Sequence, residues 1–310
     1  MLSISVVIVS YNSGKFLSDN IESLLAQTEP FREIIVVDNG SVDNSLEILS
    51  EYDKINLIRP EKNIGYSAAL NRGIEASGSD LILAANSDIR LDRNFNREMK
   101  NKFGEEPGLD IASPLILRFD GQTVDSAGQF HSASLYPVEK GFGRPREEVE
   151  IKDGKVFSVC GAATVFRRES LERLKVDGEY YDESFFMFWE DFDIGWRASL
   201  YGMTAKLIPG AEVYHFRGGT LKESLLTRFS MALSRSGEIK FHLVKNRYLT
   251  LIKNFRFSSH WYRLPVMGLK DLIWVGMLTL SSPKIIIKLM GSFRIFRTAF
   301  NRRKVIKSNE

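Results

Sequence analysis

Three carboxylates, Glu190, Asp191 and Asp193, follow a run of apolar and aromatic residues at positions 185–189. A carboxylate beside apolar walls loses hydration, which raises its pKa and suits it to accept a proton from a hydroxyl group near neutral pH. Acidic residues in the first turn of a helix are also stabilised by the helix dipole, so helix capping is a second interpretation. We favour general acid–base chemistry at this acidic cluster.

A second oxygen-rich segment, Asn86-Ser87-Asp88, directly follows the apolar run at 81–85. Magnesium typically binds one or two protein carboxylates together with diphosphate oxygens, and Asp88 is the better ligand of this triplet. His215 follows a short strand pattern and offers an imidazole to the same cation or to a diphosphate. An ordinary polar turn and a structural histidine are the alternatives.

Asp38 and Asp43 lie in the segment Val-Val-Asp-Asn-Gly-Ser-Val-Asp at positions 36–43. A carboxylate at the end of a strand can accept the ring N–H of uracil or thymine. Asp38 precedes the turn and therefore favours this role. Asp43 is equally compatible with a nucleotide contact and with the N-cap of a helix that begins at Ser45.

The segment at 63–73, Asn-Ile-Gly-Tyr-Ser-Ala-Ala-Leu-Asn-Arg-Gly, begins a helix with small residues. Such a start leaves the first backbone N–H groups available to a phosphate or a ribose. Tight turns and helix packing explain Gly65 and Gly73 equally well. No G-x-G-x-x-G motif follows the first strand, which argues against a dinucleotide-dependent oxidoreductase.

These segments must be positioned by an alternation of short apolar runs and helical patterns. Residues 4–10, 33–38, 55–59 and 80–85 predict buried strands, and residues 16–27, 44–51 and 67–77 predict helices. The alternation predicts an α/β fold with a mostly parallel sheet flanked by helices, in which ligands bind beyond the carboxyl ends of the strands. Residues 109–158 indicate irregular strands and turns, and residues 167–174 and 190–201 return to helical spacing.

Charge divides the chain into two parts, although its net charge is only +3. Residues 222–310 hold 18 Lys and Arg against 4 Asp and Glu, whereas the preceding part holds 24 against 35. We expect two or three apolar, basic helices between positions 227 and 307, attracted to an anionic partner or surface.

One part of this tail, at 283–301, predicts a helix with two kinds of face. Apolar residues recur at three- and four-residue steps, at Ile286, Leu289, Phe293, Phe296 and Phe300. Lys284, Lys288, Arg294, Arg297 and Arg302 lie at other angles. The pattern fits an anionic membrane surface and packing on the catalytic domain or in a homo-oligomer equally well, and we expect no nucleic-acid partner.

Two further features bear on location. The longest apolar candidate for a membrane span, 264–280, is interrupted by Lys270 and Asp271. Cys160 is the single cysteine and cannot form an internal disulfide, and the first residues enter a strand pattern without a basic leader. These observations predict a cytoplasmic protein, peripheral on the inner face of the cell membrane if the tail binds lipid.

Taken in order, these motifs resemble glycosyltransferase family 2, in particular its rhamnosyltransferase-like branch. The resemblance covers residues 3–220 and includes Val-Val-Ile-Val-Ser-Tyr-Asn, Asn-Ser-Asp, Cys-Gly-Ala-Ala, Trp-Glu-Asp-Phe-Asp and Tyr-His. It implies a GT-A fold in a catalytic domain at 1–220, followed by a basic helical extension at 221–310. It also implies an inverting transfer of a sugar from a nucleoside diphosphate to an acceptor hydroxyl of a cell-surface polysaccharide or lipid-linked glycan.

The resemblance assigns roles to individual residues. Asp191 is the implied catalytic base with Glu190 beside it, and Asp88 and His215 are the implied ligands of Mg²⁺ or Mn²⁺. The implied nucleotide and substrate contacts are Tyr11, Asn12, Asp38, Asn39, Asp43, Asn63, Gly65, Asn71, Asn86, Gly161 and Ala162.

One departure concerns the metal. Asn86 stands where the family has the first acid of its D-x-D motif, so one negative charge is missing there. The branch suggests dTDP-L-rhamnose as the donor, with UDP-hexoses next. A nucleotidyltransferase on a similar sheet and a non-catalytic nucleotide-sugar-binding module are the alternative classes. This sequence has no basic, Gly-rich phosphate loop after the first strand, which argues against a nucleotidyltransferase. The Glu190-Asp191 pair argues against a binding module.

Overall fold

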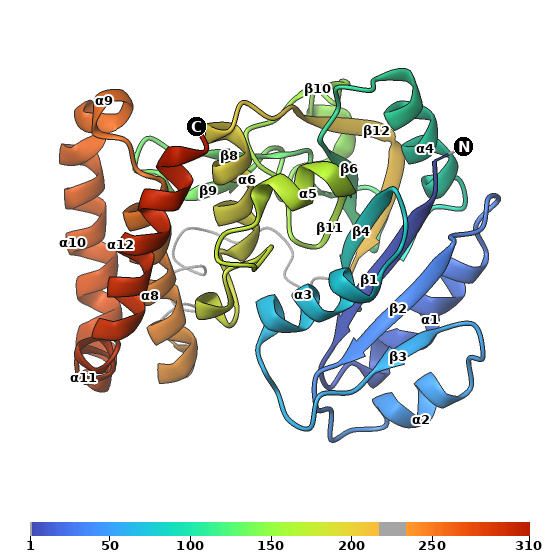
Figure 1. The fold of residues 1–310 in the computed structure, drawn as a ribbon, viewed down its shortest axis with the longest axis horizontal. Helices are drawn as coiled ribbons and strands as arrows, with labels where there is room; N and C mark the ends of the chain where they lie inside the picture. The colour runs from blue at the N-terminus through green and yellow to red at the C-terminus, as the bar shows by residue number, and fades with distance from the viewer. Residues whose placement is uncertain (1, 217–233) are drawn as a thin grey trace.

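The structure, a computed structural model, describes residues 2–216 and 234–310. The boundary expected between residues 220 and 221 therefore lies outside the described residues. A central sheet and its covering helices form one side of the molecule, and the C-terminal helices stand together at the other side (Figure 1).

The first half of the chain forms the parallel part of the sheet. Its strands are β1 (Ile4–Ser10), β2 (Glu33–Asp38), β3 (Asn56–Ile58) and β4 (Leu81–Asn86). They pair in the order β3-β2-β1-β4, all parallel. The connecting helices are α1 (Gly14–Leu25), α2 (Ser45–Ser50) and α3 (Tyr66–Ala76). All four strands and all three helices predicted for this part are confirmed, with ends shifted by at most two residues.

The second half of the sheet mixes directions. Its longer strands are β6 (Ile111–Arg118), β11 (Ala163–Arg167) and β12 (Ala205–His215). Strand β11 lies antiparallel between β4 and β6, and β12 runs parallel to β6. Shorter strands at its margins are β5 (Ile89–Leu91), β7 (Val124–Ser126) and β10 (Gly154–Lys155), while β8 (Gln129–His131) and β9 (Pro137–Glu139) form a separate two-stranded sheet. The sheet is therefore mostly parallel, as predicted.

Helices cover both faces of the sheet because alternate strand residues point to opposite sides. One face packs on α1, α2 and α4 (Phe95–Glu105), with Leu17, Leu49 and Phe95 in its core. The other packs on α3, α5 (Arg168–Leu174) and α6 (Glu190–Leu200), with Leu70, Leu171 and Ile194 in its core. The carboxyl ends of β1, β2 and β4 remain uncovered by these helices and face the region that contains the site.

The C-terminal helices pack directly on this body. They are α8 (Gly237–Asn254), α9 (Phe257–His260), α10 (Leu264–Ser281), α11 (Lys284–Gly291) and α12 (Phe293–Ser308). Helix α8 contacts α6 and the short helix η2 (Glu183–Phe185), and α10, α11 and α12 contact α8. The single helix expected over 283–301 was wrong. It breaks at Gly291-Ser292, where the Ser292 hydroxyl donates to the Lys288 carbonyl at 2.8 Å.

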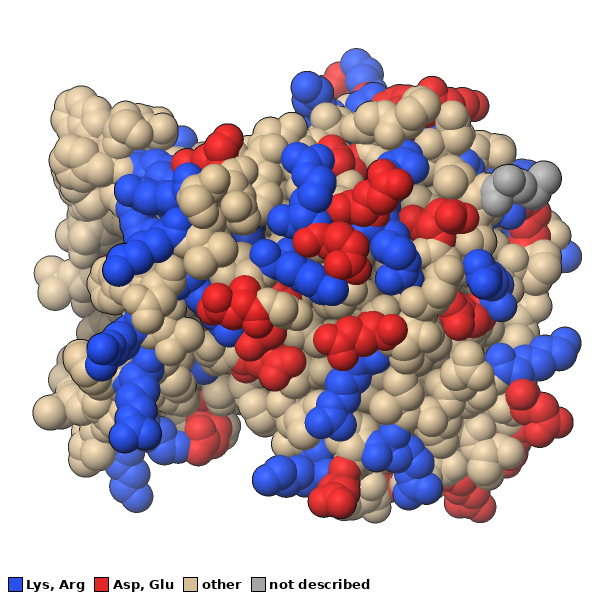
Figure 2. All heavy atoms as spheres, in the orientation of Figure 1, with Lys and Arg blue, Asp and Glu red and all other residues tan. Residues whose placement is uncertain are grey.

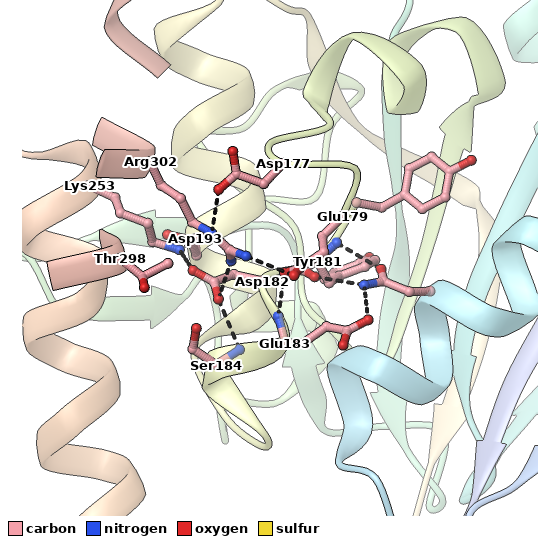
Figure 3. Close-up of polar contacts among 12 residues, drawn as sticks. Asp177, Glu179, Tyr181, Asp182, Glu183, Ser184, Asp193, Lys253, Thr298 and Arg302 are labelled. Atoms are coloured by element: carbon pink, nitrogen blue, oxygen red, sulfur yellow. Dashed lines mark hydrogen bonds and ion pairs between the residues drawn. The ribbon is translucent and has the colours of Figure 1, made fainter. Parts of the chain in front are cut away.

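A buried ion cluster joins these helices to the body (Figure 3). Lys253 on α8 lies 2.6 Å from Asp182 and 2.9 Å from Asp193. Arg302 on α12 lies 2.5 Å from Asp182 and 2.7 Å from Glu179. Burial opposes ionisation of Asp182, but Lys253 and Arg302 hold its pKa well below the ordinary value. For Arg302, packing on the catalytic body is therefore the alternative that the contacts support, because its charge is used inside the protein.

Several other basic residues of the tail are also buried. Lys240, Lys245, Arg247 and Arg256 all lie in the interior. Arg247 pairs with Asp271 at 3.0 Å and donates to the carbonyls of Leu135 and Ser134. Thus part of the positive charge counted in the sequence holds the extension on the catalytic body, and only the remainder faces outward.

Candidate active site

An open cavity of about 680 Å³ lies beyond the carboxyl ends of β1, β2 and β4. Most of the residues predicted for the site line it. They are Tyr11, Asn12, Asn39, Asn63, Asn86, Asp88, Gly161, Ala162, Glu190, Asp191 and His215. Asp38, Asp43, Gly65 and Asn71 do not. The parallel topology brings together segments that are far apart in the sequence, because the strands end at one edge of the sheet.

The loops after β1 and β2 form one wall of the cavity. Asn12, with φ of 52°, accepts the Val42 N–H at 2.9 Å, and its own N–H donates to Ser41 at 2.9 Å. Asp38 is buried behind this wall and accepts the Ser41 N–H at 3.0 Å through Oδ1. Its Oδ2 atom is buried and meets no hydrogen-bond donor among the described residues. This oxygen is therefore an unused acceptor, but it is buried behind the wall and Asp38 does not line the cavity.

Asp43 has a structural role in this wall. Its Oδ2 accepts the Gly14 N–H at 3.0 Å, and its Oδ1 accepts both the backbone N–H and the hydroxyl of Ser45. Both oxygens are used to hold the start of α1 against the start of α2. Of the two interpretations that the sequence left open, the contacts favour the helix-start role.

Asn71 and Gly65 also face the protein. Asn71 is buried and exchanges two hydrogen bonds with the backbone of Tyr181, at 2.8 and 2.9 Å, so its amide is used by the loop before Glu190. Gly65 has φ of 89°, and a Cβ there would lie 2.6 Å from the Phe186 ring. Its role is a close approach of two loops.

The start of α3 does not offer its first N–H group to a phosphate. The Tyr66 N–H donates to the Phe186 carbonyl at 2.6 Å. Meanwhile, the Asn63 side chain is engaged with Asn39 at 3.1 Å and with the Gly65 N–H at 2.9 Å. The aromatic loop already satisfies that donor, and a phosphate contact with the remaining N–H groups of this helix start stays a prediction.

Asp88 and His215 meet because β5 pairs with β12. Residue Ile89 is opposite His215 in that antiparallel pair, which places Asp88 beside the imidazole. Asp88 Oδ2 lies 3.3 Å from His215 Nε2, and Asp125 Oδ2 lies 2.7 Å from Nδ1. Burial lowers the pKa of His215, but the hydrogen bonds to Asp125 and Asp88 raise it to about 9.

These residues fit a divalent cation in part. Among residues 2–216 and 234–310, no group of three or more His, Cys, Asp or Glu side chains forms a metal site by itself. A carboxylate and an imidazole are nonetheless suitable donors, and a nucleoside diphosphate supplies the remaining oxygens in many such sites. Asp88 is part-exposed toward the cavity, where a diphosphate could complete the coordination.

Asp191 is held by three hydrogen bonds. Its Oδ2 accepts from the Gly161 N–H at 3.0 Å and from Gln129 at 3.2 Å, and its Oδ1 accepts the Phe192 N–H at 2.7 Å. A Cβ at Gly161 would lie 3.1 Å from that of Asp191, so the small residue permits this contact. Burial raises the pKa of Asp191 and the three donors oppose this rise.

Glu190 has a different environment. Its Oε2 atom is buried and has no hydrogen-bond partner among the described residues. Burial, followed by the negative charges of Asp191 and Asp193, raises the pKa of Glu190 to about 8. The two carboxyl groups therefore differ in environment: Glu190 lacks donors that would stabilise its charge, whereas Asp191 is oriented by three of them.

The aromatic loop before Glu190 is strained. Phe186, Phe188 and Trp189 have φ of 63°, 66° and 74°, a region that side chains other than glycine rarely adopt. Asn246 on α8 stabilises this shape, because its side-chain N–H groups contact the carbonyls of Phe185, Met187 and Phe188 at 3.0, 2.7 and 2.8 Å. Helix α8 thus fixes one wall of the cavity.

Four residues of this arrangement were missed in the sequence. Asp125 orients His215, Gln129 contacts Asp191, Tyr66 donates to Asn86 at 2.7 Å, and Asn246 holds the aromatic loop. Asp125 and Gln129 lie in the irregular region without a local motif, and Asn246 lies in the helical tail. Only Tyr66 had a usable signal, since it stands inside the glycine-rich segment at 63–73.

This fold, with an acidic pair and a carboxylate–histidine pair in one cavity at the strand ends, is the GT-A fold of solved glycosyltransferases. The chain belongs to glycosyl transferase family 2, whose family model matches residues 5–175. The resemblance noted in the sequence is thereby confirmed.

Two relatives are informative. The chain is 27% identical over 285 residues to N-acetylglucosaminyl-diphospho-decaprenol L-rhamnosyltransferase of Mycobacterium tuberculosis, covering 84% of this chain and 87% of that protein. It is 26% identical over 213 residues to poly-beta-1,6-N-acetyl-D-glucosamine synthase of Staphylococcus epidermidis. That second match covers 67% of this chain and 48% of the synthase.

Solved structures share the fold. Staphylococcus aureus TarS 1-349 in complex with UDP matches with a TM-score of 0.54 and 17% identity, covering 99% of this chain and 91% of that one. The Pyrobaculum calidifontis mannosyltransferase PcManGT, in complex with GDP-Man and Mn²⁺, matches with a TM-score of 0.58 and 14% identity, covering 99% and 86%. GalNAc-T7 with UDP, GalNAc and Mn²⁺ matches with a TM-score of 0.59 and 20% identity, covering 72% and 46%.

Proposed function

We propose that this glycosyltransferase is an inverting rhamnosyltransferase, which moves L-rhamnose from dTDP-L-rhamnose to a hydroxyl group of a lipid-linked N-acetylglucosamine. The observation that carries the reaction type is the single cavity that holds both the Glu190-Asp191 pair and the Asp88–His215 pair. Support for the donor and acceptor comes from the mycobacterial relative, which is similar over most of both chains.

In this proposal Asp191 accepts the proton of the acceptor hydroxyl. The freed oxygen attacks the anomeric carbon as the bond from that carbon to the diphosphate breaks, and the nucleoside diphosphate leaves. Asp191 is suited to this step because Gly161, Gln129 and Phe192 fix its orientation. The attack from the face opposite the leaving group inverts the anomeric centre.

Asp88 and His215 are proposed as the protein ligands of Mg²⁺ or Mn²⁺. When bound, such a cation neutralises negative charge on the departing diphosphate. Two related solved structures contain Mn²⁺, which supports a divalent cation in general. The buried, free Oδ2 of Asp38 is proposed to accept the ring N–H of the thymine base.

A donor panel tests the proposal. The protein is incubated with dTDP-L-rhamnose, UDP-N-acetylglucosamine, UDP-glucose or GDP-mannose, with Mn²⁺ and with or without a short-chain polyprenyl-diphosphate N-acetylglucosamine. We expect acceptor-dependent release of dTDP from the first donor at a rate at least about tenfold above the others.

Other outcomes would reassign the substrate or the class. Acceptor-dependent UDP or GDP release would move the proposal to that donor. Formation of a nucleoside triphosphate and a sugar 1-phosphate when pyrophosphate is added would indicate a nucleotidyltransferase. Donor binding without release of any nucleotide, under all acceptors tried, would indicate a binding module.

A further inference from the structure

Helix α10 directs charged residues toward the protein and apolar residues outward, which is the opposite of an ordinary surface helix. The face that packs on the protein includes Met267, Asp271 one turn later and Leu278 two turns after that. Asp271 pairs with Arg247 at 3.0 Å and accepts from the Tyr136 hydroxyl at 2.9 Å. The neighbouring Lys270 ammonium lies 4.1 Å from the centre of the Tyr136 ring. The charged residues in the middle of this helix are therefore directed to protein partners.

The outward face of α10 and the adjoining α11 is apolar. Six of its residues are between 53% and 82% exposed: Leu269, Leu272, Ile273, Leu280, Ile287 and Met290. Large contiguous apolar surfaces of this kind on a folded protein mark a contact with another molecule or with lipid. In Figure 2 the edge of the molecule at this end is almost free of charged side chains.

Positive charge borders this face. Figure 2 shows Lys and Arg side chains along the C-terminal helices beside the uncharged edge. Lys284, Arg294 and Arg297 are exposed, and none of them has an acidic partner within the described part of the chain. Phe293, which is 69% exposed, lies next to Arg294. An apolar surface with an uncompensated basic border matches the acyl and phosphate layers of an anionic leaflet.

We infer that the outer face of α10 and α11 docks the enzyme on an anionic membrane surface, with the Leu and Ile side chains in the interfacial layer and the border Lys and Arg at the lipid phosphates. The inference rests on the proposed function insofar as a lipid-linked acceptor lies in that membrane. Helix α11 packs on α8, and Leu243 of α8 lines the cavity, so a docked enzyme holds its cavity close to the lipid.

Two other uses of the face fit less well. The segment Phe257–Ser281 is long and apolar enough to cross a membrane by length and composition. A spanning α10 would have to withdraw Asp271 from Arg247 and leave both charges unpaired, which costs several kcal/mol. A two-fold dimer would bring the same basic border of two copies together, and like charges across an interface oppose association.

Vesicle flotation tests the inference. The full chain is mixed with phosphatidylcholine vesicles, with or without about one-third phosphatidylglycerol, at low and high salt. The variants are Leu269→Glu/Leu272→Glu on the apolar face and Arg294→Gln/Arg297→Gln on its border. Leu57→Glu on β3, which is 37% exposed at the other side of the molecule, is the matched control. Thermal unfolding checks that each variant folds.

We expect wild type and Leu57→Glu to float with anionic vesicles only, and less at high salt. The double Leu variant should lose more than about tenfold of its partitioning. The double Arg variant should lose about fivefold per charge removed. Absence of wild-type flotation, or flotation unaffected by the double Leu variant, would overturn the inference. A dimer that forms without lipid and dissociates in the double Leu variant would instead assign the face to a second copy.

This assay needs neither donor nor acceptor. Failure of flotation together with normal dTDP release would therefore refute the docking surface alone. Normal flotation without any nucleotide release would refute the proposed function alone.

Discussion

The Nδ1 atom of His215 lies 2.7 Å from a carboxylate oxygen of Asp125, a residue on the short strand β7 that is fully buried. This contact turns the other ring nitrogen toward Asp88. A carboxylate behind a ligating histidine fixes its orientation and increases its basicity, so it contributes to metal binding without touching the metal.

The first prediction concerns this contact. Asp125→Asn should weaken Mn²⁺ binding to the protein–dTDP complex by about 10- to 100-fold, because the amide no longer holds the imidazole as a charged acceptor does. Titration calorimetry with Mn²⁺ measures this directly, without turnover. Asp88→Ala should have a larger effect and remove stimulation by metal, whereas the surface variant Glu147→Gln should leave binding unchanged. Full activity of wild type in excess chelator would contradict the assignment of both ligands.

The second prediction concerns Asp191. Asp191→Asn should reduce transfer by about 100-fold or more while donor affinity stays nearly unchanged, because the base acts on the acceptor proton. The measurements are turnover and dTDP-rhamnose binding on the same preparation. Asp53→Asn is a suitable control, since Asp53 is exposed and lies outside the cavity. If Asp191→Asn keeps near wild-type turnover, then Asp191 only stabilises the start of α6, and Glu190 becomes the candidate base.

The third prediction uses the pKa of Glu190, raised to about 8 in the folded protein, mainly by burial. In the unfolded chain this carboxyl ionises near its ordinary value of about 4.3. Between these values the folded state holds a proton that the unfolded state has lost, so stability falls as pH rises from about 4.5 to 8. The glutamine of Glu190→Gln cannot ionise, so this decrease in stability with rising pH should be absent in the variant.

The measurement is the thermal unfolding midpoint of both proteins at pH 5 and pH 8. The advantage of Glu190→Gln over wild type should be larger at pH 8 than at pH 5. An equal difference at both values would mean that Glu190 is already ionised in the folded protein at pH 5.

The fourth prediction concerns Asn246, which contacts three carbonyls of the aromatic loop. Asn246→Ala should lower kcat/KM for the acceptor by about 10- to 100-fold, since small displacements of a positioning element have such effects. Donor Kd should change by less than about twofold, because Asn246 contacts none of the nucleotide-side loops. Glu238→Gln, an exposed change on the same helix, is the control. Equal losses in donor and acceptor affinity would indicate general unfolding of the site.

The parts of the fold that were predictable are those determined by local sequence. Strands such as Ile4–Ser10 are short β-branched runs buried on both faces, and their parallel order places Asn12 and Asp88 in one cavity. Strand pairing and helix packing bring distant residues together, and local patterns do not report them. The contact of Asp125 with His215 and the approach of Phe186 to Gly65 are of this kind.

The direction of the charged side chains in the C-terminal helices was likewise not predictable from local sequence. Counting Lys and Arg gave the sign of the extension but not which charges face inward. Lys253 and Arg302 are buried against Asp182, whereas Arg294 and Arg297 face outward. Helical spacing also predicted one continuous helix over 283–301, whereas α11 and α12 are separated by a break at Ser292.

The most direct test of the central claim, an Asp191-assisted inverting transfer of a sugar from a nucleoside diphosphate, is the configuration of the anomeric carbon in the product. The configuration is read from the anomeric proton coupling and the one-bond carbon–proton coupling by NMR, in the donor and in the first product formed by the wild-type enzyme. The account predicts that the product has the opposite anomeric configuration to the donor, with one nucleoside diphosphate released per sugar transferred. A product that retains the donor configuration would contradict the single-displacement mechanism and the role given to Asp191.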